Sequence, residues 1–370
     1  MKSCDSKIPE RLNRVGGQAV LEGVMMKAGE RVVTSCRKEN GEIVVSDSSF
    51  VSVRKKNKLL NIPILRGVIN FVEMMALSVK TLSKSAEALG FEEEETKFEK
   101  WLKAHLGVNL LNIIMVIGTV LGLALAVTLF IVLPSAAADL LNYLLPVELG
   151  LWRSVVEGVV RIVIFLLYLW LVSFMPDIKR TFMYHGAEHK SIACFEAGAP
   201  LTPESAKEFT RFHPRCGTSY MFFMILIGVF AGMLIRVIAP SLETWAYVAI
   251  KILILPLVMG IGYEVIMLAG KHDNAVTRIL SAPGLWVQRL TTKEPSEDML
   301  EVAIISIKCA LRDEFPEFKE YYEMRGWEKK ETEGDNGEVD GAWDEGTPAE
   351  GKCAEESVPK ENEEKANDDE

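Results

Sequence analysis

The chain has 370 residues and a formal net charge of −10 at pH 7. From Gly326 onward there are 17 acidic residues and 5 lysines, whereas the rest of the chain has 36 basic and 34 acidic residues. The acidic balance therefore belongs to the C-terminal tail and says nothing about substrates elsewhere, and we expect no nucleic-acid partner. Six cysteines without a CxxC pair exclude a disulfide framework and fit a reducing environment.

Residues 1–62 are predicted to form a small β-containing region. Residues 31–36 and 42–45 flank Asn40-Gly41, a dipeptide that strongly indicates a hairpin, and residues 50–54 alternate as a third strand would. So few strands bury little surface, so we expect this region to dock on another element. The N-terminus shows no basic-then-apolar signal sequence, which favours a cytoplasmic location.

A glycine-rich segment, residues 14–29, lies within this region. It has neither a GxGxxG spacing nor a GK[ST] ending, so nucleotide binding is not predicted. The glycines instead indicate that the backbone passes close to another element.

Residues 63–105 are predicted to hold an amphipathic helix and an acidic linker. Apolar residues recur at helical spacing between residues 64 and 89, with Glu73, Lys80 and Lys84 opposite them. Such a helix either packs on membrane helices or lies in the lipid interface, and we favour packing. The four glutamates at 92–95 predict a solvated linker.

Residues 106–270 are predicted to form a transmembrane domain. Each of four apolar runs is long enough to cross about 30 Å of hydrocarbon. They are residues 108–134, 154–175, 219–239 and 245–270. We therefore expect a mainly α-helical, multi-pass protein of the cell membrane with about four transmembrane helices and the lipid bilayer as partner.

The distribution of basic residues predicts the orientation. The segment between the second and third runs carries six lysines and arginines, whereas the one between the first and second ends with Arg153 alone. Positively charged loops stay inside, so both termini and the loop at 176–217 are expected in the cytoplasm.

Ionisable residues inside the runs differ in depth. Glu157, Arg161 and Lys251 lie near the predicted outer ends, where a structural ion pair or snorkelling accounts for them. Glu264 lies near the inner end of the fourth run, after an expected kink at Pro256. A buried carboxylate at that depth needs a cation, so Glu264 is a candidate metal ligand or base.

The C-terminal part is predicted to be a cytoplasmic helical region, residues 271–325, followed by a disordered acidic tail, residues 326–370. Residues 281–286 indicate a turn that leads to a short helix, and residues 299–311 an amphipathic helix. The tail is acidic and poor in hydrophobic residues, a composition that cannot bury a core.

The polar segment 176–217 holds three of the five histidines. A helix that begins after Pro176 places His185, Glu188, His189 and Glu196 on one face. The string from His185 to His189 matches the H-x-x-E-H pattern of inverted zinc proteases, in which both histidines bind zinc and the glutamate acts as base.

The further ligands of such a site stay open. Glu264 would complete the protease-like set. Alternatively, His213 and Cys216, after a short second helix, would close a four-ligand site with His185 and His189, which is typical of structural zinc. The simplest alternative is that these histidines are polar residues at the membrane boundary, bonded to water and backbone.

Four sequence blocks, in order, resemble the YqhQ family of bacterial multi-pass membrane proteins of unknown function. They are GGQAVLEGVMMK, YHGAEHKSIACFEAG, FHPRCGTSYMF and APGLWVQRLTTKEPSEDMLEVAI, and the resemblance covers roughly residues 10–312. The family has been described as predicted metal-dependent enzymes, which implies a metal site but names no reaction. The resemblance implies a polar core made of His185, Glu188, His189, His213 and Cys216.

Together these observations predict a metal-binding membrane protein, with zinc the favoured divalent metal. The function we expect first is a metal-dependent hydrolase at the cytoplasmic face, with Glu188 as base. The alternative is a non-catalytic membrane scaffold or assembly factor in which the polar cluster is structural. A transporter is less favoured, because four spans without an evident internal repeat do not suggest alternating access.

Overall fold

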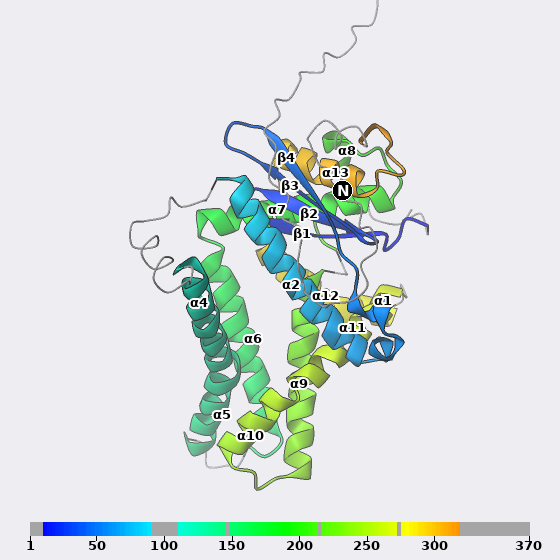
Figure 1. The fold of residues 1–370 in the computed structure, drawn as a ribbon. Helices are drawn as coiled ribbons and strands as arrows, with labels where there is room; N and C mark the ends of the chain where they lie inside the picture. Colours follow the sequence, from blue (N-terminus) through cyan, green and yellow to red (C-terminus); the bar gives the residue numbers. More distant parts are fainter. Residues whose placement is uncertain (1–9, 91–109, 145–148, 214–215, 272–274, 319–370) are drawn as a thin grey trace, which may run out of the picture.

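The computed structural model describes residues 10–90, 110–144, 149–213, 216–271 and 275–318. Figure 1 shows a β-sheet with its covering helices at one end and a group of long apolar helices at the other. The acidic linker at 92–95 and the acidic tail at 326–370 lie outside the described residues, so both stay predictions.

The sheet is an antiparallel meander in the order β1-β2-β3-β4. Its strands are β1 (Val15–Val20), β2 (Gly23–Ala28), β3 (Arg31–Arg37) and β4 (Ile43–Ser49). The predicted hairpin is confirmed: Arg37 pairs with Ile43, and Gly41 takes the positive φ of 84° that the turn requires.

Two strand assignments from the sequence are corrected. The glycine-rich segment, to which no strand was assigned, forms both β1 and β2, because the fold buries apolar residues in each half of it. The strand expected at residues 50–54 is wrong. Ser52 instead caps the short helix α1 (Val53–Lys56) by accepting from the Arg54 N–H, and η1 (Lys58–Asn61) follows.

Both faces of the sheet are covered, which confirms that this region docks on other elements. One face packs on α7 (Pro176–Glu196) and α13 (Glu297–Ala310), and α8 (Pro203–Lys207) packs on both of these helices in the same core. The Ser306 hydroxyl on α13 donates to the carbonyls of Val24 and Val33. The other face packs on Leu77 of α2 (Leu65–Ala88).

The helix α2 confirms the amphipathic helix expected near residues 64–89 and its packing role. Gly67 lies against α11 (Leu255–Lys271), where a Cβ would come within 2.7 Å of Tyr263 Cβ, and Thr81 and Ser85 are buried near the sheet. A second stripe stays exposed and apolar, as an interfacial helix would be. It consists of Val72, Met75, Val79 and Leu82.

The candidate spans are four helical units in the lower part of Figure 1. They are α4 (Leu110–Val127) continued through the π-helix η2 (Thr128–Val132) into α5 (Leu133–Leu144), then α6 (Trp152–Val172), α9 (Gly217–Ile238), and α10 (Thr244–Leu253) with α11. Three are long and apolar enough to cross a membrane, and a fourth if α10 and α11, bent by 50°, form one span. The kink predicted at Pro256 is therefore confirmed within two residues.

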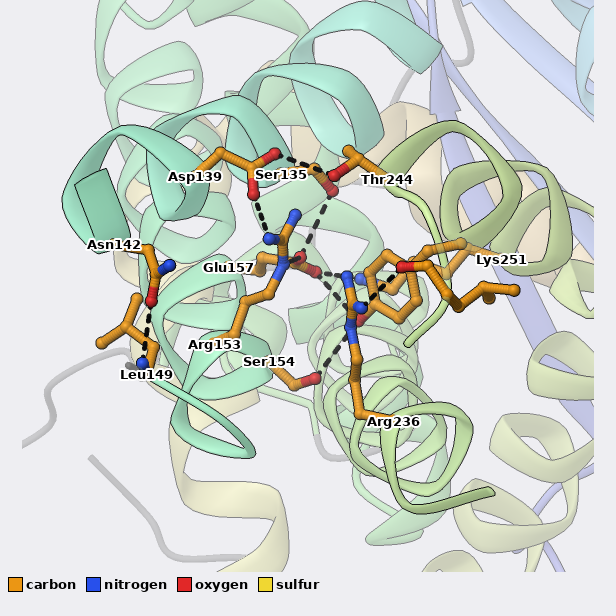
Figure 2. Close-up of polar contacts among 12 residues, drawn as sticks. Ser135, Asp139, Asn142, Leu149, Arg153, Ser154, Glu157, Arg236, Thr244 and Lys251 are labelled. Carbon is orange, nitrogen blue, oxygen red and sulfur yellow. Dashed lines mark hydrogen bonds and ion pairs between the residues drawn. The ribbon is translucent and has the colours of Figure 1, made fainter. Parts of the chain in front are cut away.

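A buried polar cluster joins α5, α6 and α10 (Figure 2). The Glu157 carboxylate is fully buried and contacts Lys251 Nζ, while Arg153 Nε donates to it at 3.3 Å. Arg153 also contacts Asp139. The predicted structural ion pair is confirmed with Lys251 rather than Arg161, which instead donates to the Phe130 carbonyl at 2.6 Å.

The turn expected at residues 281–286 is wrong. The helix α12 (Ala275–Thr291) runs through Pro283 without a break. It packs on α9 and buries Val287 and Gln288, so tertiary contacts outweigh the local preference of Pro-Gly for a turn. The amphipathic helix predicted at 299–311 is confirmed as α13.

Candidate metal centre

The helix α7 carries the H-x-x-E-H string and confirms the helix predicted after Pro176. Pro176 occupies its first turn together with Asp177, both favourable at a helix N-terminus, and Gly198 follows its end at a φ of 70°. The imidazole rings of His185 and His189, one turn apart, have centroids 4.4 Å apart. The C-terminal half of α7 is buried, so these side chains point into the protein.

Backbone carbonyls fix the orientation of both imidazoles. His185 Nδ1 lies 2.9 Å from the Thr291 carbonyl oxygen, and His189 Nδ1 lies 2.6 Å from that of Arg211. A carbonyl oxygen only accepts, so each Nδ1 carries the hydrogen and each neutral ring keeps its lone pair on Nε2. This arrangement is the usual one for histidines that bind metal ions.

Cys216, just before α9, completes a group of three. Its Sγ lies 3.3 Å from His185 Nε2, and the ligand atoms of His185, His189 and Cys216 all lie within 4.8 Å of one another. Because these are two imidazoles and a thiol in a buried position, the group can hold a metal ion.

The electrostatics of this group favour a thiolate. Burial alone raises the pKa of Cys216, but the adjacent His185 and His189 imidazoles lower it well below its ordinary value. Burial lowers the pKa of His185, but Cys216 and Glu188 outweigh it and raise this pKa to about 9, so without a metal the ring is protonated and pairs with the Cys216 thiolate. A metal ion would take the place of the Nε2 proton. The centre therefore holds a charged sulfur, the form of cysteine that binds metals.

Glu188 lies beside the group. Its Oε2 is 3.9 Å from His185 Nε2, and its side chain is buried. Burial raises the pKa of Glu188, although the two histidines partly oppose this. Gly17 on β1 contacts it: a Cβ at Gly17 would lie 3.0 Å from Glu188 Cγ and 2.7 Å from the Met25 carbonyl oxygen. The expected close approach of the glycine-rich segment is thus confirmed.

Gly186, inside the H-x-x-E-H string, allows the segment that follows α12 to pass close to α7. A Cβ there would lie 2.1 Å from the Lys293 carbonyl oxygen, so a side chain would collide with the segment that follows α12. The Lys293 N–H donates to the Phe182 carbonyl at 2.8 Å on the same helix. This crossing brings the Thr291 carbonyl to His185.

The structure places the other predicted ligands outside the group of three. His213 is near: its ring centroid lies 5.6 Å from that of His189, and its Nε2 lies 3.8 Å from Glu196 Oε2. Glu264 instead accepts from Arg66 Nε at 2.7 Å and from the Ile64 N–H at 3.3 Å, because α11 packs on the start of α2. The structure therefore does not bring Glu264 to the histidines.

Some residues that shape the centre were missed from the sequence. The Gln288 side chain accepts from the His213 N–H at 2.8 Å and donates to the His213 carbonyl at 2.7 Å, which holds the segment before Cys216. A glutamine in an amphipathic helix gave a weak signal. The carbonyls of Thr291 and Arg211 gave none, since any residue supplies one.

Comparison with known proteins assigns the chain to a family. Residues 62–313 match the family described as protein of unknown function (DUF1385), a range that includes the centre and the candidate spans. The chain is 36% identical over 303 residues to the "Uncharacterized protein YqhQ" of Bacillus subtilis (strain 168), covering 80% of this chain and 92% of that protein. No solved structure matches significantly. The chain therefore belongs to the YqhQ family.

Proposed function

We propose that this protein is a metal-dependent hydrolase of the membrane, with a zinc ion on His185 Nε2, His189 Nε2 and Cys216 Sγ. The observation that carries the proposal is that carbonyls hold both Nδ1–H groups, so that both Nε2 atoms face Cys216. Two imidazoles and a thiolate suit zinc better than magnesium or calcium, which prefer oxygen ligands.

Three protein ligands suit catalysis, because catalytic zinc sites keep one position open. A bound zinc ion supplies a water whose pKa is lowered towards about 7. Glu188, whose Oε2 lies 3.9 Å from His185 Nε2, would accept the proton from the attacking water and return it to the leaving group. Its burial keeps its proton affinity high enough for both steps.

A structural centre is the second candidate, and one observation favours it. The centre joins α7, the segment before α9 and the end of α12, and the His213 ring lies close enough to His189 to suggest a fourth ligand after a small shift. In that case the protein is a scaffold or assembly factor whose polar cluster holds these elements together.

Metal content and function of four variants separate the two candidates. In the hydrolase, His189→Ala and Cys216→Ser lose the metal, whereas Glu188→Gln keeps it, retains thermal stability and shows the full phenotype of a null strain. In the structural centre, His213→Ala loses the metal as well, and Glu188→Gln is nearly silent. A wild-type protein that purifies without stoichiometric metal would refute both.

We further propose that the centre faces the cytoplasm. The sheet precedes the first candidate span, α7 and α8 lie between the second and third, and α13 follows the last, yet all of them pack together (Figure 1). Elements that pack together lie on one side of a bilayer. The chain between them then crosses the bilayer an even number of times, so the bent α10–α11 pair counts as one crossing. The basic loops favour the cytoplasmic side.

Reporter fusions test this orientation. Fusions at Glu204 and after Lys293 are expected to report a cytoplasmic position, and fusions at Asn142 and Ser241 an external one. An external report at Glu204 would contradict the orientation, and opposite reports at Glu204 and Lys293 would contradict the even number of crossings.

A further inference from the structure

A cavity of about 450 Å³ lies among the candidate spans, and none of the residues that line it belongs to the H-x-x-E-H string. Its walls come from α4, η2, α6, α9, α10 and α11, and its volume is in the range of small-ligand sites. Two of its sixteen lining residues are charged, and both, Arg161 and Lys251, are cations. The remaining walls are aliphatic or aromatic apart from one glycine.

Arg161 has unused hydrogen-bonding capacity. Its Nε donates to the Phe130 carbonyl in η2, and π-helices of this kind are frequent at functional sites. A guanidinium has five N–H donors, and this bond uses one. Within the described part of the chain, Arg161 has no ion-pair partner, and a Cβ at Gly228 would lie 3.6 Å from its Nη1.

The neighbouring carboxylates are already engaged by other cations. Glu157 contacts Lys251 and Arg153, and Asp139 contacts Arg153 and accepts from the Thr244 hydroxyl (Figure 2). Two carboxylates thus lie among four cations when Arg161 and Arg236, which lies over the Tyr247 ring, are included. A positive charge in apolar surroundings is costly unless an anion accompanies it, so the cavity suits an anionic ligand.

The cavity opens towards the surface that would face lipid. Leu123, Tyr168 and Met221 line it, and each is at least half exposed on a candidate span. An occupant that enters through this opening has to be compatible with hydrocarbon, and its charged end has to reach Arg161.

We propose that this cavity binds an anionic membrane lipid, with a hydrocarbon chain along the apolar walls and a phosphate or carboxylate headgroup on Arg161 and Lys251. Arginine pairs with both of these anions through two parallel hydrogen bonds. The site is separate from the candidate metal centre and does not depend on the function proposed for it.

The proposal is tested on the full-length protein in a neutral maltoside detergent, with amphiphiles that share one alkyl chain length and differ in headgroup. Dodecyl phosphate and dodecanoate are each titrated, and the melting temperature is measured. Both are expected to raise it saturably, and the larger rise identifies the preferred headgroup. Dodecyltrimethylammonium, with the opposite charge, and inorganic phosphate, without a chain, are expected to give no comparable rise.

Three variants locate the site. Arg161→Met removes the anion partner and is expected to weaken binding of the anionic probes about tenfold or more. Gly228→Leu fills the cavity and keeps Arg161, and a similar loss is expected, since its Cβ position is open apart from Arg161. Gly122→Leu is the matched control: Gly122 is on α4, is exposed and does not line the cavity.

Gly228→Leu and Gly122→Leu both replace a helical glycine by leucine, so they can be compared with each other even if Arg161→Met does not fold. Equal binding by Gly228→Leu and Gly122→Leu would overturn the proposal. So would a wild-type protein that the anionic probes do not stabilise, or equal stabilisation by the cationic probe or by inorganic phosphate.

Discussion

Two buried polar clusters of this protein differ in the groups that balance their charges. In the cluster of Figure 2, the carboxylates of Glu157 and Asp139 already contact Arg153 and Lys251. In the candidate metal centre, the ligand atoms of His185, His189 and Cys216 lie within 4.8 Å of one another, and without a metal the protonated His185 ring balances the Cys216 thiolate. The carboxylates of the first cluster are neutralised by cations of the protein itself, whereas the second cluster can exchange a proton for a metal ion.

The largest effect is expected from breaking the internally neutralised cluster. Glu157→Leu leaves Lys251 buried without its carboxylate and Arg153 with Asp139 alone, and removing one partner of a buried ion pair costs about 3–5 kcal/mol. Thermal unfolding in detergent measures the loss. Asp139→Asn is the milder control, because the Asp139 side chain is 40% exposed. Equal losses in both variants would show that burial of Glu157 does not decide the effect.

Removing a metal from the second cluster is expected to cost nearly as much. If wild-type protein is isolated with metal at about a hundred times its dissociation constant, a chelator lowers stability by about 3 kcal/mol. Melting temperatures with and without chelator give the difference. His189→Ala should be insensitive to the chelator, and a wild-type protein equally insensitive would argue against a bound metal.

Gly186→Ala should disturb the metal centre through the backbone that crosses it. The new Cβ would collide with the Lys293 carbonyl oxygen and displace the nearby Thr291 carbonyl from His185, and overpacking of this kind costs about 1–3 kcal/mol. Stability and metal content should fall together. Gly16→Ala is the control, since nothing lies within 4 Å of its Cβ position. Unchanged metal content in Gly186→Ala would mean that the crossing does not orient His185.

The smallest effect is a pH dependence of the metal-free protein. Burial raises the pKa of Glu188, so the folded state holds this proton more tightly than the unfolded state. Its stabilising contribution is complete below the unfolded pKa of about 4.3 and is lost as pH rises through the raised pKa. Relative to Glu188→Gln, chelator-treated wild type should therefore become less stable from weakly acid to neutral pH. Parallel melting curves of the two proteins across this range would contradict the raised pKa.

The sequence predicted those features that depend on local patterns. The hairpin at Gly41, the helix that carries His185 and His189, and the kink near Pro256 each follow from turn chemistry or helical spacing. Features set by distant contacts were not predictable. Glu264 was expected to face a cation beside the histidines, yet its partner is Arg66, about two hundred residues earlier. A depth estimate cannot reveal which helix packs alongside.

The same limit explains the two missed strands and the wrong turn. The strands β1 and β2 come from a segment whose glycines masked its buried residues, and only the helices that pack on one face of the sheet explain why Val24 and Met26 are apolar. Pro283 marks a turn by its local preference, but α12 continues through it because its buried face packs on α9. Backbone carbonyls that orient histidines leave no pattern in a sequence at all.

The cover that α13 provides for the sheet has a consequence for biosynthesis. Val24 and Ser306, which share a hydrogen bond, are 282 residues apart. At about 5–20 residues per second, the sheet leaves the ribosome roughly 15–55 seconds before the helix that covers one of its faces. During this delay α7 covers only part of this face, so the apolar side chains that α13 buries stay uncovered while the candidate spans are made. We therefore expect this face to complete its packing only when the last helix arrives.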